Sequence, residues 1–287
     1  MLVSHLFDLV PIWMLLIGTI LVMAVFIECG FRLGRKAQVR SKKAQTSQVR
    51  AIMGAGLGLL AFMLAFTFST AQSHFEVRVQ SLAEEARIAR NAFMQADLLA
   101  EPSRTQAKHL LKDYIELRSD IRRITMRKST DQNNGALLVE AIRASEQIHQ
   151  DLWVLVAKGE GQIPAEQGQT NENEPLISSV LALIDIHYTR MHSAVMNRIP
   201  LTIWMTLYLM AILSMIIMGY QAGLTDRRSP VATITLAVAF SAVITLITDL
   251  DRPVMSFFDI NNQLLVNLYE DMQADLRLEY HPGDQTR

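Results

Sequence analysis

Residues Val10–Phe31 have the sequence VPIWMLLIGTILVMAVFIECGF, and RLGRKAQVRSKK follows at Arg32–Lys43. A helix of about 20 apolar residues is about 30 Å long, which matches the hydrocarbon core of a bilayer. No Lys or Arg precedes the apolar stretch, and basic residues stand where a signal peptide would have its small-residue cleavage site. We therefore interpret this stretch as a membrane-spanning helix that the mature protein retains.

Three further apolar stretches of similar length lie at Ala51–Thr70, Ile199–Gln221 and Val231–Leu250. The polar insert between the second and third stretches, Ala71–Arg198, carries too much charge to enter lipid. Half of the residues are hydrophobic, yet 19% are charged, which indicates a solvated domain beside the membrane helices. We predict an all-α membrane protein with four transmembrane helices and a large helical-bundle insert between the second and third spans.

This prediction divides the chain into four parts. They are a first transmembrane helix pair with a basic cytoplasmic connector (1–70), an extramembrane helical bundle (71–198), a second transmembrane helix pair (199–250), and a C-terminal part with an Asp-Arg-Pro element, an amphipathic helix and a disordered tail (251–287).

Positive charge in the two short connectors predicts the orientation. The first connector contains Arg32, Arg35, Lys36, Arg40, Lys42, Lys43 and Arg50, and the second contains Arg227 and Arg228 against Asp226. Short loops rich in Lys and Arg stay in the cytoplasm, so the insert and both termini are expected in the periplasm of an inner-membrane protein. The alternative interpretation, an anchor for lipid headgroups, places the basic connector at the same leaflet.

Helical periodicity continues through the insert. Residues 70–101 lack Gly and Pro and carry apolar residues at spacings of three or four, so the second membrane helix is expected to continue for about 50 residues. Pro102 is expected to end it. Polar segments at 129–135 and 160–175 predict a turn and a loop between further helices, and Pro200 predicts a kink at the entry to the third span.

Several motifs occur in a fixed order along the chain. LIDIHYTR at Leu183–Arg190 is followed by GYQAGL at Gly219–Leu224 and by TDLDRP at Thr248–Pro253. With earlier matches from about Ala51, these segments resemble the bestrophin-like bacterial membrane proteins, a family described as a domain of unknown function. The resemblance implies distant kinship with bestrophins, which are oligomeric anion channels.

The Asp-Arg-Pro element lies where the fourth span is expected to leave the membrane, on the side of the bundle. Charges at such a boundary are costly unless they are paired, so one interpretation is a structural ion-pair cluster. The alternative is an ion-selecting mouth of a pore; a metal or ligand site is a third, weaker alternative, because no tight ligand spacing is present. The predicted members are Asp249, Asp251, Arg252, Asp185, His187, Arg190, Arg198 and Arg78.

Small and polar residues recur on one face of the fourth span, at Ser241, Thr245 and Thr248. Such a face usually allows close helix packing, and lining of a pore is the alternative. Gly54 and Gly58 on the second span leave the same two alternatives open.

Two more local patterns carry predictions. Glu28 lies four residues before Arg32, a spacing that predicts an ion pair on one helix. The apolar positions of Ile260–Leu276 predict a short helix that lies on the membrane surface, against the bundle or against a neighbouring subunit.

No nucleophile elbow, phosphate loop, metal tetrad or paired catalytic carboxylate motif stands out, so neither enzyme activity nor a cofactor nor a metal is expected. A net charge of −1 argues against a general nucleic-acid binder. The expected partners are membrane lipid, further copies of the chain and small ions. Two functions remain open: an oligomeric channel with its pore on the symmetry axis, and an outward-facing sensor or scaffold that acts through a separate partner.

Overall fold

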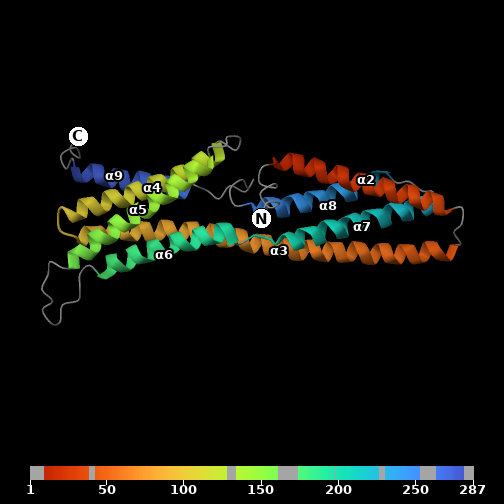
Figure 1. The fold of residues 1–287 in the computed structure, drawn as a ribbon, viewed down its shortest axis with the longest axis horizontal. Helices are drawn as coiled ribbons and strands as arrows, with labels where there is room; N and C mark the ends of the chain where they lie inside the picture. Colours follow the sequence, from red (N-terminus) through yellow and green to blue (C-terminus); the bar gives the residue numbers. More distant parts are fainter. Residues whose placement is uncertain are drawn as a thin grey trace. The chain divides into compact units, whose positions relative to one another are not determined.

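A computed structural model describes residues 10–38, 43–127, 134–160, 174–196, 198–225, 230–252 and 263–280 (Figure 1). These residues form helices and contain no strand, which confirms the all-α class. Most of the predicted 129–135 turn, nearly all of the 160–175 loop, the element from Pro253 onward and the tail lie outside the described residues.

Eight α-helices and one 3₁₀ turn make up the described residues. They are α2 (Ile12–Gln38), α3 (Lys43–Gln95), η1 (Ala96–Leu98), α4 (Ser103–Arg127), α5 (Asn134–Glu160), α6 (Glu174–Met196), α7 (Leu201–Thr225), α8 (Pro230–Asp251) and α9 (Gln263–Tyr280).

The prediction of one long helix through the second span is confirmed by α3, which has 53 residues. Its end differs from the prediction. The chain tightens into η1, where the Leu99 N–H donates to the Ala96 carbonyl at 3.1 Å, and Leu99 is extended. Pro102 therefore lies in the connection to α4 and is not the residue that ends the long helix.

Pro200 separates two helices, where the sequence predicted a kink. Helix α6 ends at Met196 and α7 begins at Leu201. The Pro200 carbonyl accepts the Ile203 N–H at 3.0 Å, so Pro200 lies at the start of α7. A proline is favourable there because the first N–H groups of a helix have no partner within it.

The chain divides into two compact units, and the division falls within α3 at Glu76. Unit 1 comprises residues up to Glu76 together with 197–258, and unit 2 comprises 77–196 together with 259–287. Four helices are long and apolar enough to cross a membrane, and they are α2, α3, α7 and α8. This confirms the four spans that the apolar stretches predicted.

Close backbone contact joins α2 to α7 in unit 1. A Cβ atom added to Gly30 would lie 2.1 Å from the Ile216 carbonyl oxygen, and one added to Gly219 would lie 2.1 Å from the Ile27 oxygen. Only glycine allows two helix backbones to approach so closely. The same contact recurs one turn later, at Gly34 and Gly223.

The pair Gly54 and Gly58 differs from these glycines, because a Cβ atom added at either position would meet nothing within 4 Å. This part of α3 is exposed in the single chain, as are the nearby Phe62 and Phe66 side chains. The sequence thus singled out a glycine pair with open space around it in the described part of the chain, and it did not reveal the pairs on α2 and α7 as packing sites.

Unit 2 has its own apolar core, built from α3, η1, α4, α5, α6 and α9. Helix α4 lies against α5 and α9, and α5 lies against α6 (Figure 1). The apolar stripe of α9, with Leu265, Leu268 and Met272, is buried in this core. Of the three placements that the sequence left open for the C-terminal helix, the structure has the one against the bundle.

Candidate functional site

A buried carboxylate lies at the centre of unit 2. Glu85 of α3 is 0% exposed, and it lies on the same face as the buried Leu82 and Ala89. This spacing of three and four residues turns Glu85 into the core together with its apolar neighbours. A buried carboxylate is costly unless charged or hydrogen-bonding groups compensate it.

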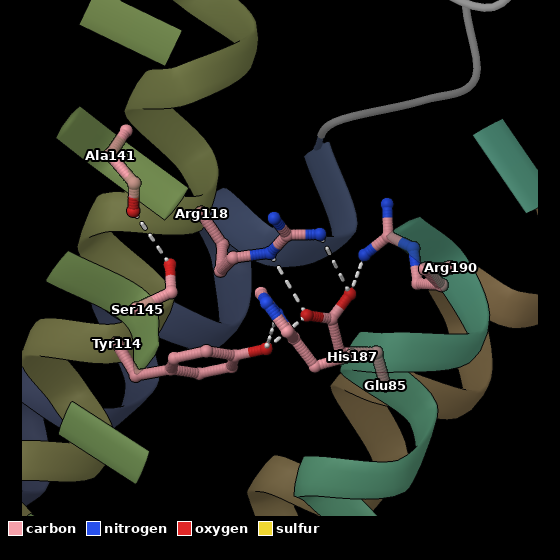
Figure 2. A network of polar contacts seen from close by, with 7 residues as sticks. All are labelled: Glu85, Tyr114, Arg118, Ala141, Ser145, His187 and Arg190. Carbon is pink, nitrogen blue, oxygen red and sulfur yellow. Dashed lines mark hydrogen bonds and ion pairs between the residues drawn. The ribbon is translucent and has the colours of Figure 1, made fainter. Parts of the chain in front are cut away.

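Three side chains from two other helices bind the Glu85 carboxylate (Figure 2). Tyr114 and Arg118, one turn apart on α4, reach Oε1: the Tyr114 hydroxyl donates to it, and Arg118 Nε donates to it at 2.9 Å. Arg118 Nη2 lies 3.5 Å from Oε2, and Arg190 of α6 forms an ion pair with the same oxygen. Two guanidinium groups thus share one carboxylate, which leaves an excess of positive charge.

Two buried histidines lie next to this ion cluster. His149 of α5 is 5% exposed and His187 of α6 is 1% exposed. Their ring centroids are 4.8 Å apart with the rings nearly perpendicular, and the Tyr114 ring lies 4.9 Å from that of His149. Nε2 of each histidine is buried and has no hydrogen-bond partner among the described residues.

The contacts of Tyr114 favour one tautomer of His187. Tyr114 Oη lies 3.4 Å from His187 Nδ1, and the single hydroxyl proton of Tyr114 is directed to Glu85. The Tyr114 oxygen is then an acceptor toward His187, which favours the tautomer with the proton on Nδ1. His187 is in this way the outermost member of a chain that runs through Tyr114 to the carboxylate.

Burial determines the protonation states in this cluster. Burial lowers the pKa of His187 to about 4, and the positive charge of Arg118 acts in the same direction. Burial also lowers the pKa of His149 to about 4, with smaller contributions from His187 and Arg118. Burial raises the pKa of Tyr114 to about 12 and lowers that of Arg190 to about 10. At neutral pH both imidazoles and the phenol are therefore uncharged.

A second buried charge links the C-terminal helix to the same unit. Lys108 of α4 is 1% exposed, and its Nζ lies 2.6 Å from Asp97 Oδ1 and 3.2 Å from Asp275 Oδ2. The Phe93 ring lies 5.1 Å from the same Nζ, within the range of a cation–π contact. Since Asp97 belongs to η1 and Asp275 to α9, the ion pairs of Lys108 connect α4 to both of these elements.

A family model described as the bestrophin-like domain matches residues 18–263, a range that includes most of α2, the other three apolar helices and the Glu85 cluster. The chain belongs to the bestrophin-like family. No curated protein and no solved structure matched it.

In this bestrophin-like chain, the eight residues of the predicted boundary cluster belong to two separate units. Unit 2 contains Arg78, Asp185, His187 and Arg190, and unit 1 contains Arg198, Asp249, Asp251 and Arg252. The structure brings His187 and Arg190 together at Glu85, whereas Asp185 is exposed. A joint site of all eight residues stays a prediction.

The members in unit 1 connect helix ends. Asp251 Oδ1 accepts the backbone N–H of Ile199 at 2.9 Å, and Arg252 Nη2 donates to the Val10 carbonyl at 2.7 Å. Asp249 is 1% exposed and Arg252 is 4% exposed. These two contacts link the end of α8 to the residues before α7 and before α2.

The hydroxyls on α8 are engaged within unit 1. Ser241 Oγ lies 3.3 Å from Met23 Sδ, and the Thr245 and Thr248 hydroxyls donate to backbone carbonyls one turn earlier. Ser241 and Thr248 are buried, as helix packing requires. Lining of an ion path by these residues stays a prediction.

Reasoning from the sequence missed Glu85, Tyr114, Arg118 and His149. The signal that could have revealed Glu85 is its position within the apolar stripe of α3, where an acid is unexpected. His149 likewise lies between Ser145 and Leu152 on the buried face of α5. The predicted pair of Glu28 and Arg32 is confirmed at 3.1 Å.

Proposed function

We propose that this bestrophin-like protein is an oligomeric inner-membrane channel for small ions, with its pore on an axis shared by several copies. The observation that carries the proposal is the filled interior of unit 1, where Leu60, Leu207, Met215, Ile244 and Ile247 are each below 2% exposed. A single chain therefore leaves little room for an ion path. Conduction in this family member requires that copies enclose the path between them.

The exposed part of α3 supports such an assembly. Small residues on a lipid-facing helix allow a neighbouring helix to approach closely, and Gly54 and Gly58 have open space around them. Exposed apolar side chains continue the same helix at Phe62 and Phe66. A second copy packed here would cover both features.

Ion flux into liposomes tests the proposal, and Asp251→Asn is the informative variant. Asparagine keeps a carbonyl oxygen for the Ile199 N–H while it removes the charge. We expect flux above that of empty vesicles for the wild type and altered flux or ion preference for Asp251→Asn. Asp151→Asn, which neutralises an exposed acid in unit 2, is the control. Flux equal to that of empty vesicles would reject the channel.

The proposed orientation places the basic connectors in the cytoplasm and unit 2 in the periplasm. Support comes from Arg32, Arg35 and Lys36 at the end of α2, because the positive-inside bias counts residues close to span ends. To test this, a reporter enzyme that works only outside the cytoplasm can be fused after Gly135. We expect this fusion to show reporter activity. Activity of a cytoplasmic reporter at the same position would reverse the orientation.

A sensor or scaffold is the second candidate, and the buried Glu85 cluster favours it. Unit 2 is a compact bundle with titratable groups in its core, and a change in their protonation would couple the bundle to external pH. We propose no enzymatic role. The oligomeric state separates the two candidates: a ring with a continuous axial path supports the channel, and a closed dimer supports the scaffold.

A further inference from the structure

An apolar groove lies on unit 1 between α2, α7 and α8. It has a volume of about 240 Å³, and its lining includes Ile20, Ala24 and Phe31 from α2, Ala222 from α7, and Ile234 from α8. Among the residues that the structure describes, Glu28 is the one ionisable side chain in the lining. The lining comes from the middle of α2, between Ile20 and Phe31, from the C-terminal half of α7 and from the N-terminal half of α8, so on α7 and α8 the groove lies toward the connectors.

Basic residues continue the same face of α2 toward its end. Arg35 lies four residues after Phe31, so it occupies the next position of the stripe that lines the groove, about 6 Å further along the axis. Lys36 follows it in the last turn, and both side chains are exposed. The apolar groove thus leads to positive charge at the level where a membrane helix meets lipid headgroups.

The carboxylate in the groove does not cancel this charge. Glu28 Oε1 accepts from Arg32 Nε at 3.1 Å, so one acid is matched by one base on the same helix. Arg35 and Lys36 then add two positive charges, and the last turn of α2 has no acid. The mouth of the groove therefore favours an anion, and its interior favours an alkyl chain.

We propose that this groove binds one acyl chain of an anionic phospholipid, whose phosphate is held by Arg35 and Lys36. The volume lies below that of most pockets for whole ligands, as expected where a single alkyl chain enters and the rest of the lipid stays in the bilayer. A second copy fits the site less well. Copies share one orientation in the membrane, so their basic turns would meet at the same depth and repel each other.

Native mass spectrometry of the full-length protein, with equal amounts of phosphatidylglycerol and phosphatidylethanolamine added, tests the headgroup contact. We expect the wild type to retain phosphatidylglycerol in preference. Loss of one basic residue at the membrane surface is worth about 1 kcal/mol, so Arg35→Gln should lower phosphatidylglycerol binding about five-fold. Arg50→Gln, an exposed arginine near the start of α3, is the matched control and should leave binding unchanged.

A second pair of variants tests the acyl chain. Ala24→Phe fills the groove and should abolish retention of the lipid, whereas Ala239→Phe adds the same volume at an exposed position of α8 and should not. Glycerol phosphate, which has the anion without the chains, should not compete. Equal retention of both lipids, or full retention by Ala24→Phe, would overturn the proposal. A smaller assembly of Ala24→Phe on size exclusion would instead identify a second copy as the occupant.

Discussion

The helices of the two units pack in opposite ways. In unit 1, α2 and α7 approach until backbone meets backbone at Gly30 and Gly219. In unit 2, the helices stay far enough apart to enclose Glu85, Arg118 and Arg190, a cluster of charges, within an apolar core.

The difference follows from the solvent that each unit is expected to face. Lipid provides no hydrophobic drive for one apolar helix to join another, so close van der Waals contact between small residues has to stabilise the membrane helices. In water, burial of apolar side chains drives association, and the bundle can tolerate the cost of a buried ion cluster. The loss of one charge should therefore destabilise unit 2 more than unit 1, and a larger side chain at a helix contact should destabilise unit 1 more than unit 2.

Removal of the carboxylate should have the largest effect. In Glu85→Ala, Arg118 and Arg190 lose their shared acid inside the core, and breaking a buried ion cluster in this way costs about 3–5 kcal/mol. Hydrogen exchange in peptides from α4, α5 and α6 should rise accordingly. Glu84→Ala is the control, because the neighbouring Glu84 side chain is exposed and forms an ion pair with the exposed Arg87 of the same helix. Exchange that is equal in the two variants would contradict a stabilising cluster.

Acidification should have an effect of comparable size, again in unit 2. The pKa of His149 and of His187 is about 4 in the folded protein against 6.5 ordinarily, so between these values the unfolded chain binds more protons. The free energy of unfolding should therefore fall as the pH decreases from about 7 to about 4. The loss is about 3 kcal/mol for one imidazole and less than twice that for the pair, since their titrations are coupled.

The double variant His149→Gln, His187→Gln isolates this contribution from that of the carboxylates. Its hydrogen exchange in α5 and α6 should depend less on pH than that of the wild type. An identical pH dependence in the two proteins would show that the imidazoles are not responsible.

A methyl group at the α2–α7 contact should have the smallest effect of the three, and it should appear in unit 1. In Gly219→Ala the new Cβ would collide with the Ile27 carbonyl, and relief of such overpacking costs about 1–3 kcal/mol. The thermal stability of the detergent-purified protein should fall. Gly18→Ala, where nothing lies within 4 Å, should instead be neutral or slightly stabilising, because alanine favours the helix.

The sequence alone predicted the membrane helices, because an apolar stretch of about 20 residues is rarely found outside a membrane span. It also predicted the length of α3, since the absence of Gly and Pro up to Glu101 is a local property. The Glu85 cluster could not be predicted in this way. Its members come from three helices, and only their packing brings Glu85 to Arg118 and Arg190.

The glycine contact between α2 and α7 could likewise not be predicted from the sequence. Gly54 and Gly58 have the spacing of a packing motif, as do Gly30 and Gly34, and the sequence does not state which pair has a neighbour. The pairing of α2 with α7, rather than any property of one helix, makes the difference.

The ion pairs of Lys108 have a consequence for biosynthesis. Helix α9 completes the core of unit 2, yet it follows α7 and α8 in the chain. The ribosome must therefore deliver both of the last spans to the membrane before Asp275 can reach Lys108. Until then the core of unit 2 lacks the apolar side chains of α9, and exposed apolar surface in such an intermediate favours aggregation.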